Sequence, residues 1–216
     1  MLERMDLFFE ARLSDYDLHM LRDIEGAQDF YPFTAQQLPR EPGATMLDLG
    51  CGTGLELEYY FPLAPEAAVT GIDLSEKMLE TMLDKFPGKN LRLIRGSYFE
   101  VPLGEAVYDA AVSVESLHHF TGEEKLGLYQ KLYAALKDGS CFILTDYFAD
   151  TDAQERHFRQ ELLRQKAEQG LHDEAIYHYD TPLTRNHEIH ILREAGFREV
   201  TPLKRWGATH CIRAVK

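Results

Sequence analysis

LDLGCGTG, residues 47–54, is the stretch of sequence that decides the fold. A short apolar run leads into three glycines at alternating positions, and an amphipathic segment follows. Glycine allows a sharp turn and lets a ligand approach the backbone closely. The stretch therefore predicts a strand, a ligand-binding turn and a helix that opens at Gly54.

The composition of this turn discriminates between nucleotide ligands. A phosphate-binding loop requires a Gly-Lys-Ser/Thr end, and a dinucleotide loop reads G-x-G-x-x-G, whereas this turn reads G-x-G-x-G. Asp48 precedes the first glycine and disfavours a pyrophosphate, but it suits a ligand that carries an ammonium and a sulfonium. S-adenosylmethionine has both groups. Asp73 follows Gly50 at about the distance of a ribose-binding acid in dinucleotide folds.

Short apolar runs alternate with amphipathic segments on both sides of the turn, which predicts an α/β fold with a mostly parallel sheet. Ser75 is a predicted helix N-cap, and Thr121 with Glu124 forms a predicted capping box. Gly139 and Gly196 are predicted C-cap glycines. Seven strands are expected, at residues 45–49, 68–73, 91–95, 108–114, 141–147, 197–203 and 209–215.

The length of 216 residues predicts one domain with four parts. Residues 1–43 form a helical N-terminal cover in which Ser14 is the expected cap, and residues 44–149 form the cofactor-binding core. Residues 150–183 form a helical cap, and residues 184–216 a closing helix and hairpin. The two added segments either cover the sheet or enclose the substrate, and the sequence leaves both readings open.

Charge and composition limit the classes of partner that the protein is expected to bind. The 36 acidic residues outnumber the 23 basic ones, and a net charge of -13 repels nucleic acid. The opening lacks the apolar core of a secretory signal, and no apolar run approaches the roughly 20 residues of a membrane span. Cys51, Cys141 and Cys211 are odd in number, lie far apart in the chain and show no C-x-x-C spacing, which fits a reducing compartment. We expect a cytoplasmic protein without nucleic-acid or membrane partners; nothing in the sequence indicates its oligomeric state.

The chain resembles the class I S-adenosylmethionine-dependent methyltransferases. LDLGCGTG (47–54) and GIDLS (71–75) look like their first two motifs, and residues 108–120 and 136–147 resemble the fourth and fifth strand segments. Residues 190–200 and the final strand are similar to the family's closing hairpin. The resemblance implies a doubly wound, Rossmann-like, seven-stranded sheet, mostly parallel with an antiparallel last strand.

The resemblance also implies how the cofactor is held. The turn from Gly50 to Gly54 would wrap the methionine portion, Asp48 would lie near its amino group or sulfur, and Asp73 would hold the ribose. Many family members have Gly-Asp after the third strand, where this chain has Gly-Ser. The resemblance therefore implies where the adenine contact lies, but not that an acid makes it. The expected contacts are Asp48, Gly50, Cys51, Gly52, Gly54, Asp73, Leu74, Met78, Ser97, Tyr98, Val114, Tyr16 and Met20.

The segment after the fourth strand bears on the acceptor. It lacks the Asn/Asp-Pro-Pro of amino-directed enzymes, and its S-x-x-x-L-H-H form resembles small-molecule methyltransferases, including those of quinone biosynthesis. Glu115, His118 and His119 stand at the carboxyl end of a strand, where open α/β sheets bind ligands. They are the candidate catalytic residues, as a general base or an acceptor clamp; for the histidines, simple loop packing or cofactor contact is the alternative.

A metal site is not expected. His157, His172 and His178 are not spaced as metal ligands usually are. His187 and His190 share a predicted helix face, but no third ligand stands at a fixed spacing from them. Three rival functions stay open: a tRNA wobble-uridine modifying enzyme of the same fold, a nicotinamide oxidoreductase, and a non-catalytic protein that binds S-adenosylmethionine and regulates a partner.

Overall fold

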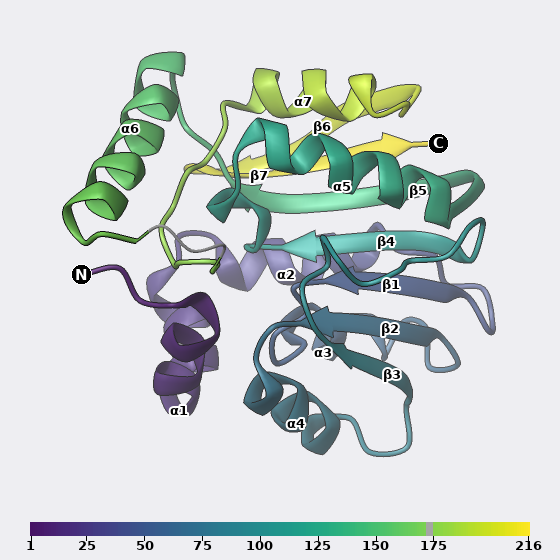
Figure 1. Cartoon of the computed structure of the whole chain (residues 1–216). Helices are drawn as coiled ribbons and strands as arrows, with labels where there is room; N and C mark the ends of the chain where they lie inside the picture. Colours follow the sequence, from purple (N-terminus) through teal and green to yellow (C-terminus); the bar gives the residue numbers. More distant parts are fainter. Residues whose placement is uncertain (172–174) are drawn as a thin grey trace.

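The computed structural model describes residues 1–171 and 175–216. Its centre is one seven-stranded sheet with the order β3-β2-β1-β4-β5-β7-β6 (Figure 1). β1 to β5 are parallel, and β7 runs antiparallel to both β5 and β6. The strands are β1 (Thr45–Leu49), β2 (Ala68–Asp73), β3 (Asn90–Arg95), β4 (Tyr108–Val114), β5 (Leu136–Tyr147), β6 (Glu199–Trp206) and β7 (Thr209–Val215). The predicted doubly wound sheet with an antiparallel last strand is confirmed.

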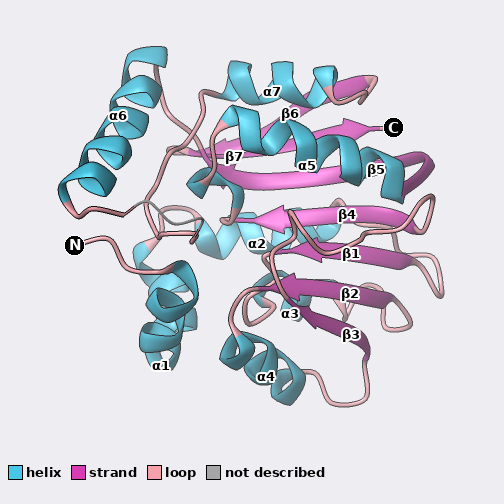
Figure 2. Cartoon of the chain, in the orientation of Figure 1, coloured by secondary structure: helices cyan, strands magenta, loops and turns pink. Residues whose placement is uncertain are grey.

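Helices cover both faces of the sheet (Figure 2). One apolar cluster joins the sheet to α5 and α7, and a second joins its other face to α2, α3 and α4. α1 and α6 lie instead beside the end of the sheet toward which the arrows of β1 to β5 point. The helices are α1 (Met5–Asp23), α2 (Ala27–Gln36), α3 (Leu55–Tyr60), α4 (Glu76–Lys85), the 3-10 turn η1 (Leu117–His119), α5 (Gly122–Ala135), α6 (Asp152–Glu168) and α7 (Arg185–Glu194).

Strand register brings the functional segments together. Leu49 at the end of β1 pairs with Ile72 of β2, and Asp48 pairs with Val112 of β4. The carboxyl ends of these parallel strands therefore meet at one edge of the sheet, where the glycine turn, Asp73 and η1 begin. This is the edge at which open α/β sheets bind ligands.

The predicted helix starts are confirmed. The Ser75 Oγ accepts a hydrogen bond from the Met78 N–H, and Thr121 and Glu124 form a complete capping box. Gly54 is the N-cap of α3, and Gly196, with a φ of 115°, follows the last turn of α7. These signals are local, because a cap satisfies backbone groups within the same turn of helix.

Two predicted caps are wrong. Ser14 lies inside α1, which starts at Met5 because the Met5 N–H donates to the carbonyl of Ile176, 2.9 Å away, and a distant segment thus defines the helix start. Gly139 lies in β5 and not after a helix, since α5 already ends at Ala135. Its φ of 79° falls where the β4–β5 register shifts, and glycine adopts this conformation without strain.

The two added segments contact each other. Arg4 and Tyr177 form an isolated antiparallel bridge, the His178 N–H donates to the Glu3 carbonyl, and the His178 ring stacks on Phe8. α6 has no buried residue. Within the described residues, no helix combines the length and apolar character needed to cross a membrane.

Candidate active site

The glycine turn follows β1 and requires its glycines. Gly50, Gly52 and Gly54 all have positive φ, at 71°, 49° and 74°. A Cβ on Gly50 would lie 2.0 Å from the Ser116 Oγ, so a side chain there meets both backbone strain and a clash. The turn therefore exposes bare backbone to the space between β1, β2 and η1.

Asp73 at the end of β2 shapes this turn. One carboxylate oxygen accepts the Gly52 N–H at 3.0 Å, and the other accepts the Ser75 N–H at 2.8 Å. Burial raises the pKa of Asp73, although these backbone hydrogen bonds act in the opposite direction. Each oxygen retains acceptor capacity, so the carboxylate can still receive a ligand hydroxyl.

Asp48 and Glu56 are buried carboxyl groups beneath the turn. Both oxygens of Asp48 and the Oε1 of Glu56 lack hydrogen-bond partners within the described part of the chain. Burial and the neighbouring Glu56 raise the pKa of Asp48 well above its usual range. Unpaired buried carboxylates disfavour an anionic ligand and favour a cationic one. The ammonium and sulfonium of S-adenosylmethionine fit this site, and a pyrophosphate does not.

A narrow cavity of about 50 Å³ lies between the glycine turn and α1. Ligand pockets commonly measure 300–1,000 Å³, so this cavity by itself is too small for an adenosyl ligand. The structure brings seven predicted cofactor contacts into its lining: Tyr16, Gly50, Gly52, Asp73, Leu74, Met78 and Tyr98. Two candidate catalytic residues, Glu115 and His119, line it as well.

Other expected contacts lie outside that lining. Asp48 is fully buried below the turn, and Cys51 packs in the core against Gly71. The Ser97 Oγ accepts the Phe99 N–H, and Gly54 lies against Phe86. Val114 packs in a core cluster, and Met20 lines a second cavity. For these residues, contact with the cofactor stays a prediction.

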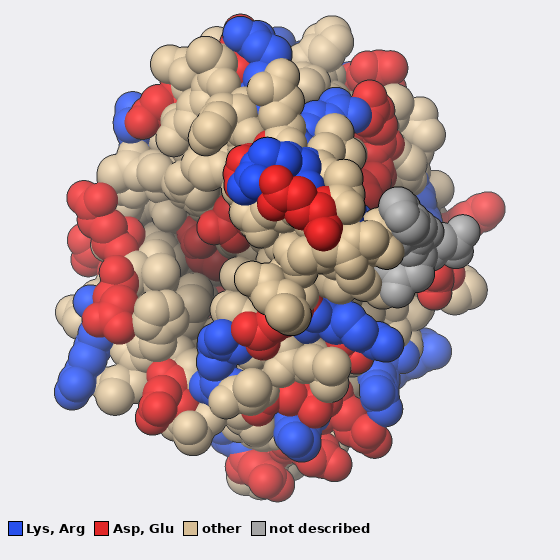
Figure 3. All heavy atoms as spheres, turned by 60° about the vertical axis from the view of Figure 1, so that its left-hand side comes forward, with Lys and Arg blue, Asp and Glu red and all other residues tan. Residues whose placement is uncertain are grey.

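The second cavity is much larger, at about 890 Å³. Its lining includes α1, the Glu115–His119 segment, the loop between β6 and β7, and His178 and Asp180 of the connector. Figure 3 brings this side forward and shows a hollow with acidic side chains inside it. Phe9, Tyr16, Glu115 and His119 line both cavities, so the two spaces adjoin at these side chains.

His118, His119 and Asp180 form the inner wall of the large cavity, and Asp146 is buried behind them. The His118 Nδ1 lies 2.6 Å from Oδ1 of Asp146, and its Nε2 lies 3.7 Å from Oδ1 of Asp180. The His119 Nδ1 lies 3.2 Å from the same Asp180 oxygen. Burial opposes the charged form of His118, but the Asp146 and Asp180 carboxylates outweigh it and raise its pKa to about 9. Burial and the charge of His118 lower the pKa of His119.

Glu115 stands between the two cavities. Its φ of 48° is unusual for a residue with a side chain, and such backbone strain concentrates at functional sites. Its Oε1 accepts the Thr209 hydroxyl at 3.0 Å. Burial raises the pKa of Glu115 to about 7.

Sequence reasoning missed two residues of this site. Asp146 lies at the carboxyl end of the strand predicted at residues 141–147, so the same rule that selected Glu115 and His118 would have selected it. Asp180 lies in the connector, and no local signal distinguishes it there. Of the histidines considered for a metal, His178 lines the large cavity, whereas His187 pairs with Glu155 at 2.6 Å. His172 lies outside the described residues.

Comparisons with known proteins agree with this geometry. The family model for the methyltransferase domain matches residues 46–139. The uncharacterized methyltransferase YdaC of Bacillus subtilis is 31% identical over 126 residues, which cover 58% of this chain and 68% of YdaC. Cycloartenol-C-24-methyltransferase of Arabidopsis thaliana is 28% identical over 139 residues, 60% of this chain and 40% of that enzyme. The chain thus spans less than half the length of some curated relatives.

Solved structures share the fold at lower identity. Human N-acetylserotonin methyltransferase in complex with S-adenosylmethionine superposes with a TM-score of 0.64 at 20% identity. The match covers 98% of this chain and 59% of the human chain. At this identity the likeness shows a shared fold.

Proposed function

This chain belongs to the class I S-adenosylmethionine-dependent methyltransferases, and on that premise we propose that it methylates a small-molecule acceptor bound in the 890 Å³ cavity. One observation carries the proposal: this cavity adjoins the glycine-turn cavity through four shared side chains. A donor held at the turn and an acceptor in the large cavity then face each other across Glu115 and His119. The size of the cavity suits a small molecule.

The chain's own residues would hold the donor from three sides. The Asp48 and Glu56 carboxyl groups favour its positive charges, the glycine turn admits its methionine portion, and Asp73 receives the ribose hydroxyls. Leu74 and Met78 would flank the adenine. When bound, S-adenosylmethionine would supply an electrophilic methyl group, which a nucleophile attacks in line while the sulfur leaves as a neutral thioether.

Positioning would supply most of the catalysis. Well-oriented reactants gain up to about 7–11 kcal/mol of barrier reduction, and two adjoining cavities provide that orientation. As the acceptor's bond to the methyl group forms, the methyl–sulfur bond breaks and the demethylated cofactor leaves. For a hydroxyl acceptor, the displaced proton passes to a base, and Glu115 is the proposed base because it lies where the cavities meet.

An assay with a methyl-labelled cofactor tests this function. The protein is incubated with labelled S-adenosylmethionine and a small-molecule extract, and both the demethylated cofactor and labelled products are measured by mass spectrometry. We expect label in the low-molecular-weight fraction, and a Glu115→Gln variant should label it more slowly. Label confined to a tRNA fraction would replace the proposal with the tRNA alternative, and binding without turnover would favour the regulatory one.

A further inference from the structure

We propose that the inner wall of the large cavity binds one divalent transition-metal ion of the Zn²⁺ type. The ligands would be the Nε2 of His118, the Nδ1 of His119 and a carboxylate oxygen of Asp180. The donor atoms of these three residues lie within 4.8 Å of one another. This site deepens the proposed function, on which it rests for the identity of the molecule that meets the ion.

The distances fit a shared ion. Zinc binds imidazole nitrogen at about 2.0–2.1 Å and carboxylate oxygen at about 2.0–2.2 Å, so neighbouring ligand atoms of a tetrahedral site lie about 3.4 Å apart. Oδ1 of Asp180 lies 3.2 Å from the His119 nitrogen and 3.7 Å from the His118 nitrogen. These two separations bracket the expected value, and the two histidine nitrogens lie within 4.8 Å of each other.

A buried carboxylate orients the first ligand. Oδ1 of Asp146 lies 2.6 Å from the Nδ1 of His118, which directs the opposite ring nitrogen toward Asp180. The two oxygens of Asp146 also accept the N–H groups of Tyr147 and Leu117, each at 3.0 Å, so the carboxylate is fixed in place. Metal-binding histidines usually donate their other ring nitrogen to such a partner, which sets the tautomer.

The backbone fixes the spacing between the ligand-bearing segments. His118 and His119 lie on η1, directly after β4, whereas Asp180 comes from the connector that follows α6. The Thr181 N–H donates to the His118 carbonyl at 2.8 Å, which joins the two segments next to the ligands. The position of Asp180 is therefore built into the fold.

The donor set indicates both the ion and the ligand class. Two imidazoles and one carboxylate suit zinc, iron and cobalt, whereas magnesium prefers an all-oxygen shell. Three protein ligands leave coordination positions open, and these would face the large cavity that His118, His119 and Asp180 line. Such an ion would select an acceptor with a hydroxyl or carboxylate oxygen and would lower the pKa of a hydroxyl.

Cobalt titration tests the site without any methyl transfer. The chelator-treated full chain is titrated with Co²⁺, and the visible absorption is followed before displacement by Zn²⁺. We expect one equivalent per chain, and at least about 10-fold weaker binding in Asp180→Asn and His119→Gln. His187→Gln is the matched control, because His187 also pairs with a carboxylate but lies outside the site. Equal affinity in Asp180→Asn and wild type overturns the proposal.

Two further measurements separate the possible failures. X-ray absorption of the Zn²⁺-loaded wild type should show two imidazoles per ion, and a shell without imidazole overturns the site even where a variant misfolds. Binding of S-adenosylhomocysteine reports on the donor site and should be unchanged in Asp180→Asn. If metal binds but no methyl transfer occurs, the metal site stands and the proposed function is rejected. If methyl transfer survives chelation and no cobalt binds, the function stands and the metal site is rejected.

Discussion

The Nδ1 of His118 lies 2.6 Å from Oδ1 of Asp146, which is 1% exposed, although 28 residues separate them in the chain. β4 and β5 are parallel neighbours, so the segments that follow them meet at one edge. This pair orients His118 toward the acceptor cavity. Asp146 is thus a positioning residue, and its removal should affect the acceptor side of the site and spare the donor side.

Asp146→Asn should lower kcat by about 10- to 100-fold, the range typical when the hydrogen-bond partner of a metal-binding histidine is replaced. Affinity for S-adenosylhomocysteine, measured by calorimetry, should stay within a factor of about two. Asp109→Asn is the control, since Asp109 is a paired carboxylate at the opposite end of β4. A parallel loss of cofactor affinity would indicate that Asp146 acts on the whole fold.

Asp48→Asn should weaken binding without a comparable change in stability. The raised pKa of Asp48 favours its neutral form, and an Asn amide is likewise neutral, so the free energy of unfolding should change by less than about 1 kcal/mol. Affinity for S-adenosylmethionine should fall at least about 10-fold. Asp109→Asn should instead lose stability, because Asp109 accepts from Lys137 and Thr45. Unchanged binding in Asp48→Asn would remove Asp48 from the donor site.

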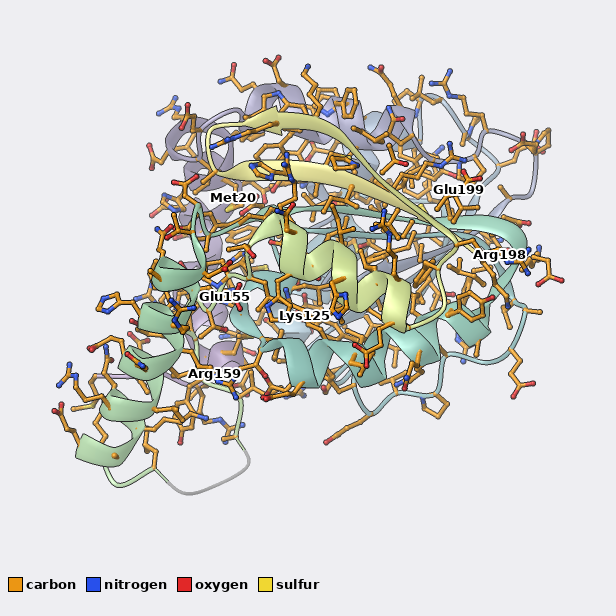
Figure 4. The ribbon with its side chains drawn as sticks, turned by 90° about the horizontal axis from the view of Figure 1, so that it is seen from above. Met20, Lys125, Glu155, Arg159, Arg198 and Glu199 are labelled. Carbon is orange, nitrogen blue, oxygen red and sulfur yellow. The ribbon has the colours of Figure 1, made fainter. Side chains whose placement is uncertain are left out.

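Breaking the buried pair between α5 and α7 should destabilise the chain strongly. The Lys125 Nζ lies 2.7 Å from Oε2 of Glu188, and Tyr129 donates to the other oxygen of that carboxylate. Lys125 is labelled in Figure 4, where α5 and α7 lie side by side. Lys125→Met leaves a buried charge and should lower the free energy of unfolding by about 3–5 kcal/mol. Adding Glu188→Gln should recover much of the loss. Urea unfolding measures both, and additive losses would mean that the two side chains are not coupled.

His210 should make stability depend on pH. Neither ring nitrogen has a partner within the described residues; burial, with the charges of Arg205 and Arg185, lowers its folded pKa to about 4. The unfolded side chain titrates near 6.5, so the unfolded state binds more protons between these values. The His210 contribution is therefore complete above about pH 6.5 and is lost as the pH falls toward 4.

The difference between wild type and His210→Gln isolates this effect from the other titrating groups, which include the nearby Asp150. Relative to the variant, wild type should lose about 2 kcal/mol between pH 7 and pH 4.5. Thermal unfolding at several pH values measures it. Identical pH profiles for the two proteins would show that His210 is protonated to the same extent in both states.

Cofactor binding should protect the N-terminal cover and the helical cap from hydrogen exchange. α1 lines both cavities, and its N-terminal turn is bonded to residues 176–178, so movement of one cover should involve the other. S-adenosylhomocysteine should slow exchange in residues 1–30 and in the glycine turn, and an acceptor should add protection within residues 150–182. If only the core gains protection, the N-terminal cover and the helical cap do not move with ligand binding and merely pack against the core.

The sequence by itself determined the sheet, the turn and the cofactor class. The bounds of β1, β2 and β4 match the predicted strands, because apolar runs and glycines act over a few residues. The Asp48–glycine arrangement was readable for the same reason: all its members lie in one turn. Local caps such as Thr121 with Glu124 were equally predictable.

Only the tertiary structure decided the acceptor side. Asp180 reaches the histidines because its connector is hydrogen-bonded to η1, and Glu188 meets Lys125 because α5 packs on α7. The true start of α1 depends on Ile176 in the same way. These contacts join segments far apart in the chain, and no local periodicity encodes them. The sequence therefore identified the cofactor that binds at the glycine turn. Only the packing of distant segments identified the side chains that line the large cavity beside it.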